Sequence, residues 1–455
     1  MFISFISVNF ISFIYIILIN ITLLFITPAN AGTEFNCPSN ANTASDTEYI
    51  VILQTNSQDE ANSIFDIIGQ CLGISVASLD PYEDMAKECA NPANLNIPSE
   101  IPSTTSSNKS FRNLSIPGGF YAFSGYYSSD FVNALSDWDA VYQVNPAVVM
   151  NASSPINFNL QRRATQDSPV WNLDRIDQKN RPLNNEYIYP DCAGDDIVIY
   201  IVDTGIDITH PEFEGRAEYG KSVCSGCPPC PYDDHGHGTH VAGIAGSHTY
   251  GVAKKSTLIA VKVLNMDGSG TDSDIITGLQ FVYEDYQKRK KSSIVNMSLG
   301  GGKSDALNLA VQAITGSGIH VVVAAGNSKG DACNSSPSSA PSAIAVGAVQ
   351  NTSDDALSSY SNFGSCVPIY APGDNVLSTY VENILDSTTA TLSGTSMASP
   401  HVAGAIALFL CDYGKDISPS DMLTRLNSTC SKNLIGNLAP SGNYSCLLKT
   451  PPTDG

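Results

Sequence analysis

The sequence predicts an α/β fold, with a parallel central sheet covered by helices on both faces and a small α+β unit in front of it. Two observations carry this prediction. In the second part of the chain, short apolar runs alternate with segments of helical period. The first part has its own shorter set of predicted strands and helices, enough for a small α+β unit. Strands that alternate with helices are typical of a parallel sheet buried on both sides.

The first elements form the small unit, at about residues 48–152. We expect strands at 49–53, 120–124 and 141–149, helices at 59–71 and 129–137, and a loop rich in Asn, Pro and Ser at 91–118. A polar stretch at 157–168, which contains Arg162-Arg163, then marks a boundary. Beyond it, apolar runs predict strands at 197–202, 258–264, 294–297 and 321–325, with helices at 273–287 and 304–315.

The N-terminus predicts export. Residues 2–28 are almost continuously apolar and lack Lys and Arg, and Ala29-Asn30-Ala31-Gly32 fits a signal-peptidase site, so residues 1–31 are interpreted as a signal peptide. The missing positive flank leaves open an uncleaved anchor at residues 1–28. The predicted location is extracellular, with a secretory-pathway compartment or the membrane as the alternative. The 12 cysteines suit an oxidising compartment.

Composition excludes some partners. Acidic residues outnumber basic ones 44 to 23, and the formal net charge is −21, which disfavours nucleic acid and anionic membrane surfaces. No membrane partner is expected unless the N-terminal segment stays uncleaved. Sequons that permit glycosylation occur at Asn108, Asn113, Asn151, Asn334, Asn351, Asn427 and Asn443. Another, at Asn296, lies in an apolar strand and is expected to be unused.

Three segments carry candidate chemistry. Asp203 ends the first strand of the larger unit, His237 lies in the Gly- and His-rich run 234–243, and Ser396 lies in the run 393–404, before an apolar helix. Each alone has a bland interpretation: a turn residue, a metal site or flexible loop, and a helix cap. Together on an α/β pattern they favour nucleophilic catalysis. A serine hydroxyl needs an imidazole to take its proton, and a carboxylate must orient that imidazole.

These segments resemble the signatures of the subtilase family in that family's chain order, from about Ala164 to at least Asp412, and most closely those of its proteinase K branch. The resemblance implies a subtilisin-like fold and a serine endopeptidase. Asp203 would orient the imidazole, His237 would act as base and then acid, and Ser396 would be the nucleophile. Asn327 matches the family's oxyanion-hole amide. His235 and His240 are interpreted as structural.

The resemblance also implies a substrate cleft. The candidate substrate-binding residues are Ser298, Leu299, Gly300, Gly268, Ser269, Gly270, Ala324, Ala325 and Gly326. The segment 298–300 would pair with the substrate's backbone and form one wall of the pocket for the residue before the scissile bond. The segment 324–326 would form the opposite wall, and 268–270 the second edge that pairs with the substrate. The small residues in these walls suggest a roomy apolar pocket, and hence broad specificity that favours hydrophobic residues before the scissile bond.

The small unit resembles the inhibitor-type propeptides of the family, so residues 32–163 would be a propeptide that chaperones and inhibits the peptidase at 164–455. Alignment with mature ends in the family puts the cut after Arg163. The dibasic pair also suits a separate processing protease, so self-cleavage stays open. Partners are therefore protein and peptide substrates and the chain's own propeptide.

Two features depart from or extend the family pattern. Pro368 stands where many relatives have a calcium-binding Asp, so no metal or other cofactor is expected to be required, although calcium elsewhere stays open. Cys333 and Cys366 match a family disulfide. The run Cys224, Cys227 and Cys230 favours disulfides over zinc in an exported chain. Nine cysteines follow Arg163, which leaves one of them unpaired or bonded to another chain.

Two rival functions remain. The chain could be an inactive scaffold whose propeptide is never released, but a non-catalyst has no need of Asp203, His237, Ser396 and Asn327 together. It could instead be a hydrolase such as a lipase. That class predicts a Gly-x-Ser-x-Gly elbow, with the histidine after the serine. The surroundings of Ser396 are Gly394-Thr395-Ser396-Met397-Ala398.

Overall fold

We describe a computed structural model of the chain over residues 35, 37–38, 47–72, 111–117, 119–152, 158–161, 168–382, 387–437 and 445–451. The predicted signal peptide and the Arg162-Arg163 cut lie outside these residues, as do the sequons at Asn108 and Asn443. Within them, no helix is long and apolar enough to span a membrane.

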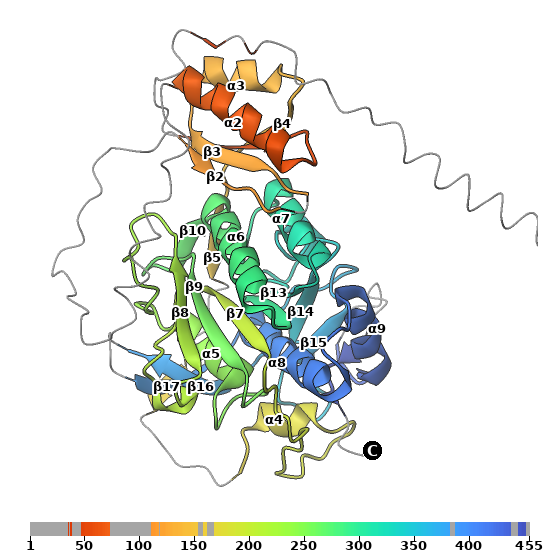
Figure 1. Ribbon diagram of the computed structural model, residues 1–455. Coiled ribbons are helices and arrows are strands. Elements are labelled where there is room, and N and C mark those ends of the chain that lie inside the picture. The colour runs from red at the N-terminus through yellow and green to blue at the C-terminus, as the bar shows by residue number, and fades with distance from the viewer. Residues whose placement is uncertain are drawn as a thin grey trace, which may run out of the picture.

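A nine-stranded sheet forms the centre of the larger unit, in the order β18-β19-β15-β14-β13-β11-β7-β9-β8 (Figure 1). All neighbouring pairs are parallel except β18 with β19. The strands are β7 (Val198–Asp203), β8 (Ala217–Ser222), β9 (Thr257–Lys262), β11 (Ser293–Met297), β13 (His320–Ala324), β14 (Ile344–Val349), β15 (Ile369–Pro372), β18 (Ser431–Lys432) and β19 (Cys446–Leu447). The predicted parallel sheet is confirmed.

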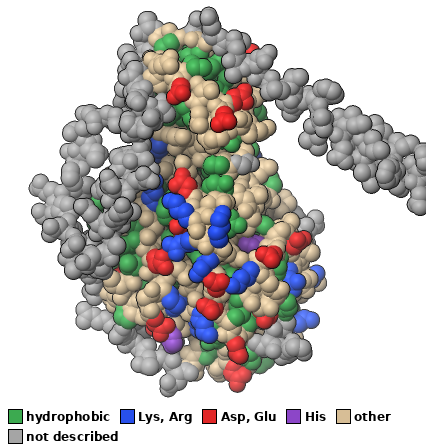
Figure 2. All heavy atoms as spheres, in the orientation of Figure 1, with side chains coloured by type: hydrophobic (Ala, Val, Ile, Leu, Met, Phe, Trp, Pro, Cys, Tyr) green, Lys and Arg blue, Asp and Glu red, His purple; other side chains and the backbone are tan. Residues whose placement is uncertain are grey.

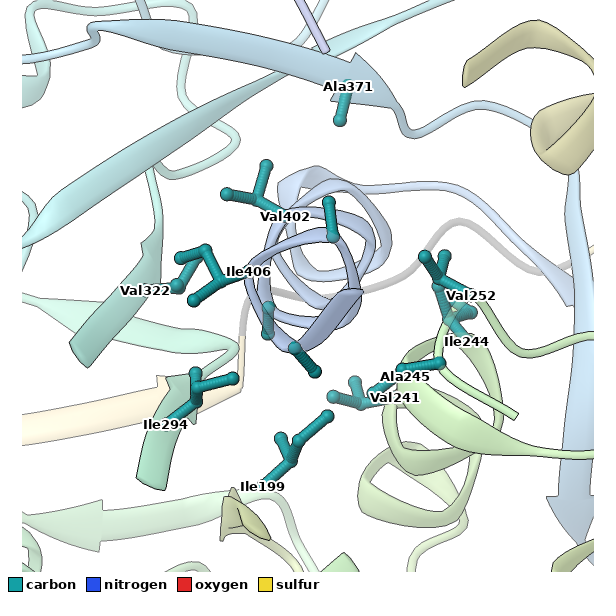
Figure 3. Close-up of a cluster of buried hydrophobic side chains, with 14 of the residues drawn as sticks. Ile199, Val241, Ile244, Ala245, Val252, Ile294, Val322, Ala371, Val402 and Ile406 are labelled. Carbon is teal, nitrogen blue, oxygen red and sulfur yellow. The ribbon is translucent and has the colours of Figure 1, made fainter. Parts of the chain in front are cut away.

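Helices cover both faces of this sheet, because its central strands are apolar on both sides. In β7, Ile199 and Ile201 belong to a core shared with α5 (His237–Gly246) and α8 (Thr395–Tyr413). The alternate residues Val198, Tyr200 and Val202 belong to a second core, shared with α6 (Asp272–Arg289) and α7 (Asp305–Gly316). Figure 3 shows α8 end-on, with Val402 and Ile406 toward the strands and Val241 and Ala245 of α5 beside it. This alternation follows the two-residue period of a strand.

The helices begin where the sequence supplies caps. Thr271 and Asp274 form a capping box at the start of α6, in which each side chain accepts from the other residue's backbone N–H. The Ser304 side chain accepts from the Leu307 N–H and caps α7. Both satisfy backbone donors that a helix start leaves without intrahelical partners.

Smaller elements surround the sheet. They are α4 (Trp171–Ile176), α9 (Pro419–Thr429), the 3₁₀ turns η3 (Pro211–Phe213) and η4 (Ala332–Asn334), and the hairpin β16 (Val376–Val381) and β17 (Ser387–Leu392). A further strand, β6 (Phe158–Gln161), pairs with β17. It lies in the polar stretch 157–168, where no strand was predicted.

The small unit is a four-stranded sheet in the order β2-β3-β1-β4, with two helices (Figure 1). Its elements are β1 (Glu48–Leu53), α2 (Gln58–Leu72), β2 (Arg112–Asn113), β3 (Ala122–Tyr126), α3 (Ser129–Ser136) and β4 (Val141–Pro146). The helices pack on one face over an aromatic core that includes Phe65, Phe123 and Phe131. β2 lies within the predicted loop at 91–118.

The predicted strand at 141–149 is wrong in one respect, because the chain breaks it in two. β4 stays in the small sheet, whereas β5 (Val149–Ala152) leaves it and pairs with β10 (Ser269–Thr271) and β12 (Leu299–Gly301) of the larger unit. Pro146 ends the first strand, and the residues after it bend toward α6: the N–H of Val148 donates to the Asp272 carboxylate at 3.0 Å.

The small unit sits on the N-terminal ends of α6 and α7 (Figure 1). The other face of its sheet, including Ile50 and Phe120, shares the buried core of those helices. Polar contacts surround this core, because Arg112 pairs with Asp274 at 2.8 Å and Ser273 donates to Glu48 at 2.7 Å. On the face shown in Figure 2, Lys and Arg lie interspersed with Asp and Glu over the larger unit rather than in one basic patch.

Disulfides join Cys37 to Cys71, Cys192 to Cys411, Cys224 to Cys227, Cys333 to Cys366 and Cys430 to Cys446. Sequence analysis left the pairing open except for Cys333 with Cys366, and left one cysteine after Arg163 over. The odd residue is Cys230, and it is disulfide-bonded as well. None of the cysteines in the described part of the chain is free.

Candidate active site

Asp203 and His237 meet at the carboxyl edge of the sheet. Asp203 is the last residue of β7, and His237 is the first residue of α5. The Nδ1 atom of His237 lies 2.7 Å from Oδ1 of Asp203, and both side chains are fully buried. This contact fixes the ring so that Nε2 faces away from the carboxylate, and Nε2 has no hydrogen-bond partner among the described residues.

The backbone before His237 requires a glycine. Gly236 has φ +92°, and a Cβ there would lie 2.4 Å from the ring of Tyr380. Both the left-handed conformation and the close approach exclude larger residues. The glycine therefore lets β16 pack against the loop that delivers His237 to Asp203.

Ser396 lies in the first turn of α8, where a proline opens the helix to a neighbouring strand. Pro400 has no N–H, so the carbonyl of Ser396 loses its usual intrahelical donor. The hydroxyl of Ser298 donates to this carbonyl instead, at 2.8 Å, and also lies 2.9 Å from the Ser399 hydroxyl. Ser396 Oγ in turn donates to the Ser298 carbonyl at 3.2 Å. Ser298 thus fixes the backbone of the candidate nucleophile.

Sheet register places these two groups over adjacent strand ends. β11 pairs in parallel with β7, with Asn296 opposite Ile201, so the continued register puts Ser298 opposite Asp203. Neighbouring strands lie about 4.8 Å apart. The register therefore brings the segment that holds His237 and the segment that holds Ser396 to the same edge of the sheet.

Asn327 approaches the start of α8 from the next strand. It follows β13, and its Oδ1 accepts hydrogen bonds from the N–H and the hydroxyl of Thr395, at 2.9 and 2.8 Å. The hydroxyl of Thr395 also accepts from the N–H of Gly326 at 3.0 Å. Thr395 thus holds the oxygen end of the Asn327 amide at the start of α8.

A pocket of ≈ 400 Å³ opens beside this turn. Gly300 and Gly301 line one side, and the segment 324–327 lines the other, so the two predicted walls do face one pocket. Leu299 does not line it, because its side chain is buried in the core with α7. Ser298 is also fully buried and holds the backbone of Ser396.

The two predicted substrate-pairing edges hold a strand of the chain itself. β5 lies antiparallel between β10 and β12, with Asn151 opposite both Ser269 and Gly300. The N–H of Ala152 donates to the Gly268 carbonyl at 2.9 Å. Gly270 pairs with Met150. A segment of the small unit thus occupies the groove next to the pocket in the extended conformation of a bound peptide.

Burial and charge act in opposite directions on His237. Burial, the largest influence, lowers its pKa, but the charge and hydrogen bond of Asp203 and the charge of Asp233 raise it, and the net pKa lies above that of an ordinary histidine. Burial instead lowers the pKa of His240 to about 3, so this ring stays neutral, with Nε2 at 3.0 Å from the Ala390 carbonyl. The pKa of His235 is also lowered, mainly by burial.

Sequence analysis missed several residues of the site. Ser335, Ser338, Tyr360 and Asn362 also line the pocket, from segments with no motif of their own. Asn362 accepts from the N–H groups of residues 328 and 330 and donates to the Ala325 carbonyl, which fixes one pocket wall. No spacing in the sequence links it to that wall. Thr395, in contrast, lies beside Ser396 and could have been noticed.

Comparisons with known proteins place the chain in a family. Residues 194–444 match the model of the subtilase family. The chain is 45% identical over 302 residues to cerevisin of Saccharomyces cerevisiae, an alignment that covers 64% of this chain and 45% of cerevisin. It is 38% identical over 382 residues to the putative subtilase-type proteinase isp6 of Schizosaccharomyces pombe, which covers 82% of this chain and 75% of that protein.

A further relative and a solved structure are also subtilisin-like or named proteases. The chain is 41% identical to the cuticle-degrading protease of Metarhizium anisopliae, over 72% of this chain and 80% of that protein. The crystal structure of a cold-adapted subtilisin-like serine proteinase superposes with a TM-score of 0.58 at 42% identity. It covers 63% of this chain and 99% of the proteinase.

Proposed function

The chain belongs to the subtilase family of serine proteases, and from this premise we propose that it is a secreted endopeptidase, made as a zymogen, that cleaves peptide bonds through an acyl-enzyme on Ser396. One observation carries the proposal. His237 is held by its Nδ1 on a buried carboxylate, and Nε2 is left for a proton from a hydroxyl at the neighbouring strand end.

The reaction follows from these positions. Ser396 attacks the scissile carbonyl and transfers its proton to Nε2 of His237, and the Asp203 carboxylate stabilises the resulting imidazolium. Negative charge develops on the carbonyl oxygen, where the Asn327 amide and the N–H groups at the start of α8 can donate to it. His237 then gives its proton to the leaving amine, and water releases the acyl group by the same steps.

Pocket shape supports a preference for hydrophobic residues before the scissile bond. Glycine and alanine form much of the two predicted walls, uncharged polar residues complete the lining, and no charged side chain is among the described residues that line the pocket. A lysine, arginine or carboxylate would lose its hydration there without a partner. Peptide anilides that carry Phe or Leu at this position should therefore be cleaved faster than those with Asp or Lys.

Peptide hydrolysis tests the proposed function. The native chain and Ser396→Ala are each treated with an added protease to remove the small unit, and then assayed on denatured casein and on the anilides. The native chain should cleave both, and the variant neither. Equal, low turnover by the two chains would favour the inactive scaffold instead.

The position of β5 supports a self-inhibited precursor. Met150 is fully buried against the larger unit, and a Cβ on Gly301 would lie 2.6 Å from its sulfur. Val149, one residue earlier in the same strand, is 59% exposed. Substituting Met150 and Val149 in turn therefore gives a matched test of whether β5 blocks the groove.

We predict that Met150→Asp releases the groove and Val149→Asp does not. Burying a lone carboxylate costs several kcal/mol, so the rate at which a fluorophosphonate labels Ser396 in the uncut chain should rise about 10-fold or more in Met150→Asp. The Val149→Asp chain should label like the native precursor. Equal acceleration by both would show that the strand is loosened generally, and no acceleration by either would count against inhibition by β5.

Asn327→Leu tests the oxyanion site. We expect kcat to fall about 100- to 1000-fold, the range recorded for the same amide in a relative of this family, with KM nearly unchanged because the donor acts on charge that develops in the transition state. The assay uses the protease-treated chain, with its active fraction counted by fluorophosphonate labelling. A change confined to KM would contradict this role for Asn327.

Export and processing complete the proposal. Residues 1–31 would be removed as a signal peptide, and residues 32–163 as a propeptide, by self-cleavage or by a protease that recognises Arg162-Arg163. Catalysis by this set of residues requires no cofactor. Pro368, just before β15, supplies no carboxylate to the calcium position of relatives.

A further inference from the structure

A second buried carboxylate stands behind the candidate triad. Asp233 lies in the loop before α5 and is 2% exposed. Its Oδ1 accepts from the hydroxyl of Thr204 at 2.8 Å and from the N–H groups of His235 and Gly236 at 3.1 and 2.8 Å. Its Oδ2 accepts from the N–H and the hydroxyl of Thr239, at 2.8 and 2.7 Å. Five donors thus converge on one carboxylate.

These donors belong to the two segments that carry the catalytic pair. Thr204 follows Asp203 directly, and Gly236 precedes His237. The Thr204 hydroxyl also accepts from the N–H of Gly238 at 2.9 Å, so it links the end of β7 to the first turn of α5. The Asp233 carboxylate therefore joins the end of β7, which supplies Asp203, to the start of α5, which supplies His237.

The start of α5 depends on this carboxylate. Its N-cap residue is Gly236, which has no side chain to accept from the first N–H groups of the helix. Asp233 takes that role from outside the cap position, through the N–H of Thr239. A negative charge at a helix N-terminus also interacts favourably with the helix dipole.

We propose that Asp233 is a positioning residue of the catalytic histidine: it fixes the first turn of α5 against Asp203 through Thr204, and its charge stabilises the protonated imidazole. The inference rests on the proposed function of His237 as the base. It goes beyond the triad because Asp233 touches neither Asp203 nor His237 in any hydrogen bond of the structure's described part, and acts through their neighbours.

Charge supports the electrostatic part of this role. The charge of Asp233 raises the pKa of His237, against the effect of burial and after the larger contribution of Asp203. The other titratable groups around the pair are His235 and Asp234 from the same loop, Lys262 from β9, His240 from α5 and Tyr380 from β16. Lys262 is directed elsewhere, to Asp234 and to the carbonyls of Thr204 and Leu264.

Asp233→Asn separates this role from a purely structural one. The substitution keeps the shape but removes the charge, and it turns one acceptor into a donor that faces the Thr239 N–H. We expect kcat to fall about 10- to 100-fold with KM little changed, because the base is misplaced. The acid limb of the pH profile should move about 0.5–1 unit lower, because loss of a negative charge makes His237 easier to deprotonate.

Two measurements separate a failure of the role proposed for Asp233 from a failure of the proposed protease function. The first is the pH profile of the protease-treated enzyme, normalised to fluorophosphonate-labelled sites. The second is the NMR titration of His237 in the full chain carrying Ser396→Ala, with and without Asp233→Asn. The NMR arm needs no activity, so it still tests Asp233 if the native chain proves to be no protease.

Control variants assign the effect. Asp207→Asn removes another buried carboxylate close to the same helix, one bonded to Thr209 and Ser387, and it should leave the His237 titration in place. Thr204→Val should lower kcat without moving the acid limb, because the charge remains, and Thr204→Ser should restore kcat. This pair also serves if Asp233→Asn does not fold.

The proposal is overturned if the His237 titration is the same with and without Asp233→Asn. It is also overturned if Thr204→Val retains native kcat per labelled site, because the link from β7 to α5 would then have no effect on catalysis.

Discussion

Replacing His237 with alanine lowers kcat by about a million-fold, the size recorded for this replacement in a subtilisin of the same family and transferred from it here. The physical reason is local. A serine hydroxyl is a weak nucleophile until a base takes its proton, and the Ser298 carbonyl that Ser396 Oγ contacts cannot do so. Without the imidazole, only the oxyanion donors and substrate binding remain to accelerate the reaction.

The measurement is kcat for a Phe peptide anilide after the small unit has been removed by an added protease. His248→Ala is the control, since this side chain is 65% exposed and pairs only with Glu214 in the described structure. The control should retain native turnover. If His237→Ala kept a tenth or more of the native rate, His237 would not be the base.

Asp355→Ala destabilises the fold by about 3–5 kcal/mol, because it leaves a buried guanidinium without its counter-charge. The Arg175 side chain is fully buried. Its Nε donates to Oδ1 of Asp355 at 2.9 Å, and its Nη2 donates to Oδ2 at 2.8 Å. Arg181 adds a third bond to the same carboxylate at 3.0 Å. Arg175 lies on α4, close after the predicted cut, so this pair fastens the first residues of the larger unit.

Urea unfolding of the Ser396→Ala chain measures this effect without self-digestion. The matched control is Glu218→Ala, which breaks an ion pair with Arg289 on the surface, with side chains 47% and 29% exposed. Exposed pairs of this kind contribute about 1 kcal/mol or less. A loss of similar, small size in both variants would mean that Arg175 finds another partner or water.

Much of the fold could be predicted because the central strands are apolar on both sides. β7, β9, β11 and β13 stand out as short apolar runs in the sequence. β8 was not predicted, since its sequence Ala-Glu-Tyr-Gly-Lys-Ser is polar and it lies at the edge of the sheet. Edge position lets such a strand form without a buried apolar face.

The break between β4 and β5 had one local signal, Asn145-Pro146, a dipeptide that often marks a turn, and the prediction of a single strand passed over it. The new partners of the second strand had no local signal. What separates the two strands is a partner elsewhere in the chain, because Met150 is buried only where β10 and β12 flank it. Local pattern does not report a partner more than a hundred residues away.

For the candidate site, the sequence offered signals where the chemistry lies within one segment. His237 and Ser396 stand in runs rich in small residues, Asp203 ends an apolar strand, and the register of β7 with β11 brings their segments to one edge of the sheet. Residues that act from a distance gave no such signal. Asp233 looks like an ordinary loop acid until its five donors are seen, and Asn362 lacks any motif.

A fluorophosphonate gel tests the central claim most directly. The native chain and Ser396→Ala are incubated with the probe, before and after the small unit is cut away with an added protease. The account predicts a labelled species of the size of residues 164–455 in the native chain alone, because only a serine activated by His237 reacts with the probe. If neither chain is labelled after the cut, Ser396 is not an activated nucleophile, and the chain is not the protease proposed here.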